Sequence, residues 1–262
     1  MFRHGNLYNA LNDLKRTPKF GKMTPFRIVG NTYFVGTYQA SSHLIDTGDG
    51  LILIDTGYEN AAHLVLESIR ELGFRPEDIK YIVNTHWHWD HTEATADFAA
   101  RSGAKTLIGR DDRDRALGYF TPDILIDDGD TLTLGDTTIT FLHTPGHTEG
   151  TISLFYDTKE NGISYRVGMF GGAGLNTLIP ECFEFEGCRE AYFASLARLK
   201  QEKVDVFIGN HTWNNGTYEK SLRLLAGGEN EFIDSEIWGE FLDSYRVRLE
   251  TLIASEQSSK GD

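Results

Sequence analysis

Residues 81–91 read YIVNTHWHWDH, and this segment is the most informative part of the sequence. The stretch begins with a short apolar run rich in β-branched residues, and this predicts a buried strand. Potential metal ligands then follow within six residues, at His86, His88, Asp90 and His91. Alternate residues of an extended chain point the same way, so His86 and His88 can converge on one ion. If the chain then turns into a helix, Asp90 and His91 face a second ion.

The ligand types in this motif are imidazole and carboxylate, which suit zinc and also iron or manganese. A polar loop is the alternative interpretation, but so many ligands at this spacing after an apolar strand argue against it. Histidine is plentiful in the chain, at 9 residues, whereas cysteine is scarce, at 2. Metal chemistry here is therefore expected to avoid thiolate clusters, and a disulfide framework is excluded.

The length and the net charge of the chain limit the number of domains and the kinds of partner that we expect. The 262 residues suffice for one large domain or two small ones. Lysine and arginine number 25 against 39 acidic residues, which gives a net charge of −14. Phosphate backbones and anionic membranes repel such a chain, so we expect a small-molecule substrate, with no nucleic acid and no membrane as partner. The chain begins without the apolar core of a signal peptide, so we expect a cytoplasmic protein.

The order of the expected elements predicts the architecture. The first half indicates strands at 26–38, 42–47, 51–55, 81–85 and 105–108, and helices at 60–72, 93–102 and 110–117. The second half indicates strands at 131–134, 137–142, 151–156, 163–169 and 206–210, and helices at 188–201, 217–226 and 231–254. We expect an α/β fold whose two sheets pack face to face with helices outside, a four-layer αββα sandwich. A doubly wound parallel sheet is weaker, because tight turns join many neighbouring strands and no Gly-rich phosphate loop follows the first strand.

No linker or repeat divides the chain, so we predict a single domain over residues 1–262. Within it, residues 1–24 form an N-terminal extension, and residues 229–262 form a C-terminal helix and tail. An apolar stripe of this last segment is expected to pack on the domain or on a partner subunit in a homo-oligomer. The stripe consists of Phe232, Ile233, Ile237, Phe241, Leu242, Tyr245, Leu249 and Leu252.

The motif at 86–91 resembles the signature of the metallo-β-lactamase superfamily, His-x-His-x-Asp-His at the end of a strand. That family has two further histidine ligands, one in a Gly-His-Thr turn and one after a late strand. They correspond here to His147 in FLHTPGHTEGT and His211 in VFIGNH. Many relatives carry a bridging aspartate between these two, but residues 166–176, RVGMFGGAGLN, contain no acid. This combination resembles the third metallo-β-lactamase subclass (class B, subclass 3), and the likeness covers roughly residues 25–255.

The resemblance implies a binuclear metal centre. It implies a first ion bound by His86, His88 and His147, and a second bound by Asp90, His91 and His211. Two zinc ions are expected, with iron or manganese as alternatives. The resemblance further implies a β-lactamase-like hydrolase in which a metal-bridging hydroxide opens a cyclic amide, with Asp90 as the catalytic residue that orients it.

Three other functions remain open. A lactone, ester or thioester hydrolase of the same fold is the main alternative, because the pocket rather than the metal motif decides the substrate. A di-iron oxidoreductase is disfavoured, since relatives of that type carry glutamate where this chain has His88. A non-catalytic metal-binding protein is the remaining class.

Several residues outside the ligand set are candidates for the pocket or its support. The β-lactamases of this subclass have a serine-containing segment that helps bind the lactam carboxylate, and GGAGLN here has no serine. Asp55 in LIDTG resembles an acidic residue of this family that supports a metal ligand without binding the metal itself. We therefore expect Asp55 to orient the imidazole of a ligating histidine. The further candidates are Trp89, Trp213, Asn214 and Tyr119. Core packing is the alternative interpretation for Trp89 and Tyr119.

Overall fold

The computed structural model describes residues 21–259, which form two sheets flanked by helices. The first sheet consists of β1 (Phe26–Val29), β2 (Thr32–Phe34), β3 (His43–Asp46), β4 (Leu51–Ile54), β5 (Ile79–Val83), β6 (Lys105–Gly109) and β7 (Ile124–Ile126). The second sheet consists of β8 (Thr131–Leu134), β9 (Thr137–His143), β10 (Ile152–Glu160), β11 (Ile163–Met169) and β12 (Val206–Phe207). The helices are α2 (Ala62–Glu71), α3 (Trp89–Thr92), α4 (Thr95–Ser102), α5 (Arg113–Ala116), α6 (Cys188–Leu199), α7 (Thr217–Leu225) and α8 (Ile237–Ser259).

The seven-stranded sheet has the order β1-β2-β3-β4-β5-β6-β7, and the five-stranded sheet the order β12-β11-β10-β9-β8. Strands β1 to β4 pair antiparallel in chain order and form a meander, consistent with the tight turns expected between neighbouring strands. From β4 onward the pairs β4–β5, β5–β6 and β6–β7 are parallel, so a crossover connection must separate each pair. Helices α2 and α4 provide two of these connections.

The layers follow from strands that are buried on both faces. Strand β4 reads LILI, and its residues alternate between two cores. Leu51 and Leu53 pack with residues of α2 and with Phe98 of α4. Ile52 and Ile54 face the other way and pack against residues of the second sheet, such as Phe141. The space between the sheets is therefore one apolar core, and helices lie outside it.

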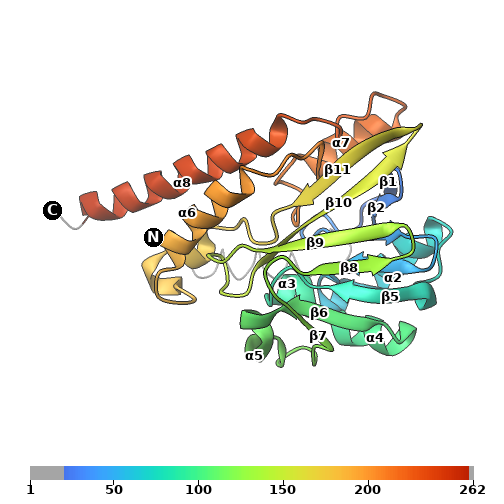
Figure 1. Ribbon diagram of the computed structural model, residues 1–262, viewed down its shortest axis with the longest axis horizontal. Helices are drawn as coiled ribbons and strands as arrows, with labels where there is room; N and C mark the ends of the chain where they lie inside the picture. Colours follow the sequence, from blue (N-terminus) through green and yellow to red (C-terminus); the bar gives the residue numbers. More distant parts are fainter. Residues whose placement is uncertain (1–20, 260–262) are drawn as a thin grey trace, which may run out of the picture.

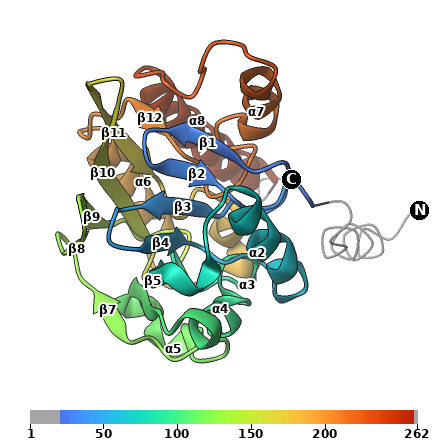
Figure 2. The same cartoon turned by 90° about the vertical axis from the view of Figure 1, so that its right-hand side faces the viewer.

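The outer face of the five-stranded sheet is covered by α6 and α8 (Figure 1). The outer face of the seven-stranded sheet is covered by α2 and α4 (Figure 2). This arrangement confirms the predicted αββα sandwich. In the described residues, no helix combines the length and the apolar content that a membrane crossing needs.

The C-terminal helix differs from its prediction at its start. The helix was expected from residue 231, but α8 begins at Ile237. The Asp234 side chain accepts hydrogen bonds from the backbone N–H groups of Glu236 and Ile237, which favours a helix beginning there. Phe232 lies instead in the core between the sheets. The apolar face of α8 packs on the domain as expected, through Trp238, Phe241, Leu242, Tyr245 and Leu249.

Three smaller differences concern the other elements. Strand β12 covers only Val206–Phe207 of the expected 206–210. Strand β7 was not among the expected strands. Residues 1–20 of the predicted extension lie outside the described residues. Met23, which was expected in the same extension, is part of the core between the sheets.

Candidate metal centre

Two groups of potential metal ligands meet at one end of the sandwich. Strands β4 and β5 are parallel, so the segments that follow them leave the sheet at the same edge. The first group is His86, His88 and His147, and the second is Asp90, His91 and His211. Within each group, one ligand atom from each residue lies within 4.8 Å of the others. The structure therefore brings together all the residues that the sequence proposed as ligands.

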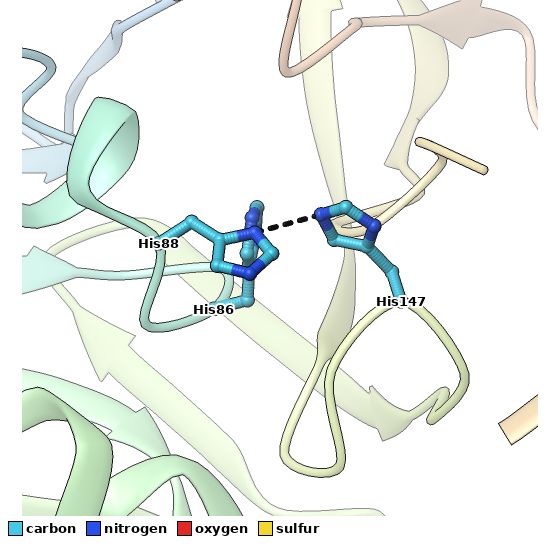
Figure 3. A group of neighbouring side chains, drawn as sticks. All are labelled: His86, His88 and His147. Carbon is cyan, nitrogen blue, oxygen red and sulfur yellow. Dashed lines mark hydrogen bonds between the residues drawn. The ribbon is translucent and has the colours of Figure 1, made fainter. Parts of the chain in front are cut away.

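In the first group, ring nitrogens face one another across a gap between two loops. His88 Nδ1 lies 2.9 Å from His147 Nε2, and His86 stands beside them (Figure 3). His147 Nδ1 donates a hydrogen bond to the Gly174 carbonyl, which leaves its Nε2 as the free acceptor. His86 Nε2 is buried and has no hydrogen-bond partner among the described residues. Burial lowers the pKa of His86 and His147 well below the usual range, so both imidazoles are neutral, as ligands must be.

In the second group, each histidine is oriented through its outer nitrogen. His91 Nδ1 donates to Asp55 Oδ2 at 2.8 Å, and His211 Nδ1 donates to the Gln39 carbonyl at 2.6 Å. Asp90 Oδ2 lies 3.6 Å from His91 Nε2 and 3.7 Å from His211 Nε2. His91 Nε2, like the corresponding atom of His86, is buried without a hydrogen-bond partner among the described residues.

The pKa values in this group follow from burial and charge. Burial lowers the pKa of His211 to about 4. Burial also lowers the pKa of His91, but the charges of Asp90 and Asp55 outweigh this effect and raise it overall. Burial raises the pKa of Asp90, yet the neighbouring imidazoles bring it below its usual range, so this carboxylate is ionised.

The donor sets fit divalent metal ions. Buried nitrogen atoms without hydrogen-bond partners are costly, and they occur here where ring nitrogens and a carboxylate point toward common centres. Three imidazoles suit a catalytic zinc ion that keeps one position for water. Two imidazoles and a carboxylate form a second set suited to the same class of ion.

Asp55 lies behind the second group, as the sequence proposed. Its side chain is fully buried and accepts hydrogen bonds from the Thr85 backbone N–H and hydroxyl, both at 2.8 Å, as well as from His91. Asp55 has a φ of 53°, a strained conformation for a residue other than glycine. The turn after β4 thus holds the carboxylate against the residues that follow β5.

Sequence reasoning missed Asp112, a buried carboxylate that ties the two ligand loops together. Asp112 Oδ2 accepts hydrogen bonds from the Trp87 backbone N–H at 3.0 Å and the Thr148 hydroxyl at 2.7 Å. Asp112 Oδ1 accepts from the Gly150 N–H at 2.8 Å. Burial raises the pKa of Asp112 to about 6, although these hydrogen bonds favour the ionised form. The sequence signal here was the charged run at 110–117, which predicted a short helix and no role for Asp112.

We expect Asp112→Asn to loosen both ligand loops. The amide retains one acceptor oxygen, so at least one buried donor loses its partner, at a cost of about 1–3 kcal/mol. Zinc affinity should fall by roughly tenfold to hundredfold, as for other residues that support ligands. Chemical denaturation and zinc titration against a chelator would measure the two effects. Asp114→Asn, at an exposed neighbour in α5, is the matched control. Unchanged zinc affinity in the Asp112 variant would contradict this role.

Glu184 is a second carboxylate that sequence reasoning missed. Its Oε1 lies 3.4 Å from His88 Nε2, the ring nitrogen that faces away from His147. Its other oxygen lies 3.8 Å from an Arg115 nitrogen. Glu184 comes from the loop before α6, 96 residues from His88, so no local pattern could have identified it.

Residues 166–176, the segment that contains no acid, approach the start of β10 and the loop after β5 closely at Gly171. A Cβ atom on Gly171 would lie 1.9 Å from the Ile152 carbonyl oxygen and 3.0 Å from Thr85 Cβ. Asn210 donates a hydrogen bond to the Gly171 carbonyl at 2.7 Å. The close approach requires glycine at this position.

Both ligand groups border a pocket of about 430 Å³, a volume typical of small-molecule sites. Trp89, Trp213 and Asn214 line it, as proposed from the sequence. Trp213 is 53% exposed and stacks on His211 with ring centroids 4.3 Å apart. Tyr119 does not line this pocket, because it packs in a separate apolar cluster with Phe120.

Comparisons with known proteins agree with this geometry. The model of the metallo-β-lactamase superfamily matches residues 35–161. A hydroxyacylglutathione hydrolase of Maricaulis maris is 32% identical over an alignment of 204 residues, which covers 76% of this chain and 72% of that protein. An N-acyl homoserine lactonase of Bacillus cereus is 27% identical, over 64% of this chain and 79% of that protein.

Solved structures extend the likeness to nearly the whole chain. A subclass B3 metallo-β-lactamase of Bradyrhizobium japonicum superposes with a TM-score of 0.87 and 28% identity, covering 93% of this chain and 98% of that one. A metallo-β-lactamase of Legionella gormanii gives a TM-score of 0.85 and 28% identity, covering 90% and 98%. With this fold, these ligand groups and these relatives, the chain belongs to the metallo-β-lactamase superfamily.

Proposed function

We propose that this metal-dependent hydrolase binds two zinc ions and opens the cyclic amide of β-lactams. The main observation behind the proposal is the pair of three-residue groups, buried or half-buried, that border one open pocket. The likeness to subclass B3 enzymes, which extends over almost the whole chain, supports the β-lactam as substrate.

The chain's own residues have separate tasks in this proposal. The three histidines of the first group would hold one ion, and Asp90, His91 and His211 the other. Zinc bound there would lower the pKa of a water molecule toward about 7 and polarise the substrate carbonyl. Asp90 is ionised, so a carboxylate oxygen can accept a hydrogen bond from the attacking water and orient it. Asp55 and the Gln39 carbonyl fix the imidazoles of His91 and His211.

A thioester or lactone hydrolase is the second candidate. The hydroxyacylglutathione hydrolase and the homoserine lactonase among the relatives favour it, since the same metal chemistry serves all three bonds. The pocket supports either class, because its lining combines polar groups with the indole rings of Trp89 and Trp213.

A panel of substrates separates these candidates. The zinc-loaded protein would be assayed with a chromogenic cephalosporin, an N-acyl homoserine lactone and a glutathione thioester. We expect the highest kcat/KM with the cephalosporin, of at least about 10⁴ M⁻¹s⁻¹, the lower end for efficient enzymes. A higher value with the thioester or the lactone would assign the second candidate, and no turnover of any member would contradict both.

Several expectations from the sequence stay predictions. These are a single domain over residues 1–262, a cytoplasmic location, no binding of nucleic acid, and a homo-oligomer formed through the C-terminal helix. Zinc also stays a prediction over iron and manganese, supported by the choice of imidazole and carboxylate ligands.

A further inference from the structure

The pocket at the two ligand groups has a cationic side chain on its wall, contributed by the C-terminal helix. Among the described residues that line the pocket, Arg248 of α8 is the one lysine or arginine. The rest of the lining includes four of the ligand residues, aromatic rings, Leu175 and uncharged polar groups such as Asn176 and Asn214. Figure 1 shows α8 lying along α6, and Arg248 is on the part of α8 that also borders the pocket.

Arg248 has no carboxylate partner among the described residues. Other arginines of the chain form ion pairs, including Arg246 on the same helix, whose Nε lies 3.0 Å from Glu250. The Arg248 guanidinium lies instead over the Tyr245 ring, with its central carbon 4.4 Å from the ring centroid. A stacked guanidinium keeps its N–H edge available, so it can still bind a planar anion through two hydrogen bonds.

A chain of contacts connects Arg248 to the second ligand group. Tyr245 is 5% exposed, and its hydroxyl accepts a hydrogen bond from Asn214 Nδ2 at 3.4 Å. Asn214 Oδ1 accepts a hydrogen bond from the His211 backbone N–H at 2.9 Å. The ring on which the guanidinium stacks is therefore held in place relative to His211, and the conformational cost of placing a cation there is reduced.

We propose that Arg248 binds a carboxylate of the substrate while the scissile carbonyl lies at the two ligand groups. The inference rests on the proposed function and narrows its substrates to anionic ones. The chain carries a net charge of −14, so binding of an anionic substrate depends on local cations. The proposed zinc ions would face the scissile carbonyl, and Arg248 offers a further positive charge on another part of the pocket wall. The segment GGAGLN has no serine to bind a carboxylate, and Arg248 supplies a cation from a different element of the fold.

The test compares two forms of one substrate that differ in a single charge. A chromogenic cephalosporin would be assayed as the free acid and as its methyl ester, with the zinc-loaded wild type and with Arg248→Ala, Arg248→Lys and Arg246→Ala. For the acid, we expect Arg248→Ala to raise KM by about tenfold, because the variant loses a hydrogen bond to a charged group. For the ester, KM should stay within about twofold. Arg248→Lys should restore part of the affinity for the acid, and Arg246→Ala should change neither substrate.

A binding measurement keeps this test independent of turnover. Quenching of tryptophan fluorescence would give the dissociation constant of the ring-opened acid, or of the intact acid if the wild type does not hydrolyse it. Arg248→Ala should weaken that binding by about tenfold, with Arg246→Ala unchanged. Equal effects of Arg248→Ala on acid and ester, or no effect on binding of the acid, would overturn the inference. Absence of turnover by the wild type would instead count against the proposed function alone.

Discussion

Replacing His88 by alanine will lower kcat for the best substrate by at least about a hundredfold. His88 Nδ1 faces His147 Nε2 at 2.9 Å, so the variant removes one of three imidazoles from the first ligand group. The ion that this group is proposed to hold would lose a ligand, and the water and carbonyl would lose its charge. Initial rates at saturating zinc would measure the loss, and circular dichroism would show whether the fold is retained.

The matched control is His63→Ala. His63 is an exposed histidine of α2, far in the sequence from any ligand, and its removal should leave kcat within about twofold of the wild type. If the His88 variant binds zinc and retains substantially the wild-type rate, His88 is not a ligand in the active enzyme.

Loading the metal-free protein with zinc will raise its unfolding temperature by about 8–16 °C. Zinc at a thousand times its dissociation constant stabilises the native state by about 4 kcal/mol. Each kcal/mol raises the melting temperature of a domain of this size by about 2–4 °C. The physical reason lies in the Nε2 atoms of His86 and His91, which are buried and have no hydrogen-bond partner among the described residues. A bound zinc ion would satisfy both atoms in the native state. Thermal unfolding of stripped and reloaded protein would measure the shift.

Magnesium provides the control for that experiment. It prefers oxygen ligands and keeps much of its water, so the same concentration should leave the melting temperature nearly unchanged. An equal rise with both ions would indicate a general salt effect. No rise with zinc would contradict a preformed metal site.

The ligand motif was readable from the sequence because its geometry is local. His86 and His88 are close in the chain, and the alternation of an extended segment predicts that they converge. The meander and the layer order followed from short β-rich runs and helical periodicity. His147 and His211 were different, since each is an isolated histidine, and only the family resemblance singled them out.

The residues that sequence reasoning missed act through contacts between distant segments. Asp112 joins the loops of Trp87 and Thr148, and it looked like one acid in an exposed charged run. Glu184 meets His88 from a loop 96 residues away. Arg248 was one of many charges on the predicted C-terminal helix, and only the packing of α8 places it at the pocket. Such contacts leave no periodic signal in the chain.

The proposed binuclear metal centre can be tested through the zinc content of the purified, zinc-reconstituted protein. Elemental analysis by mass spectrometry, after removal of unbound metal, should give close to two zinc ions per chain. The variants His88→Ala and His211→Ala should each bind fewer. A wild-type protein that retains no zinc after reconstitution would contradict a binuclear zinc centre.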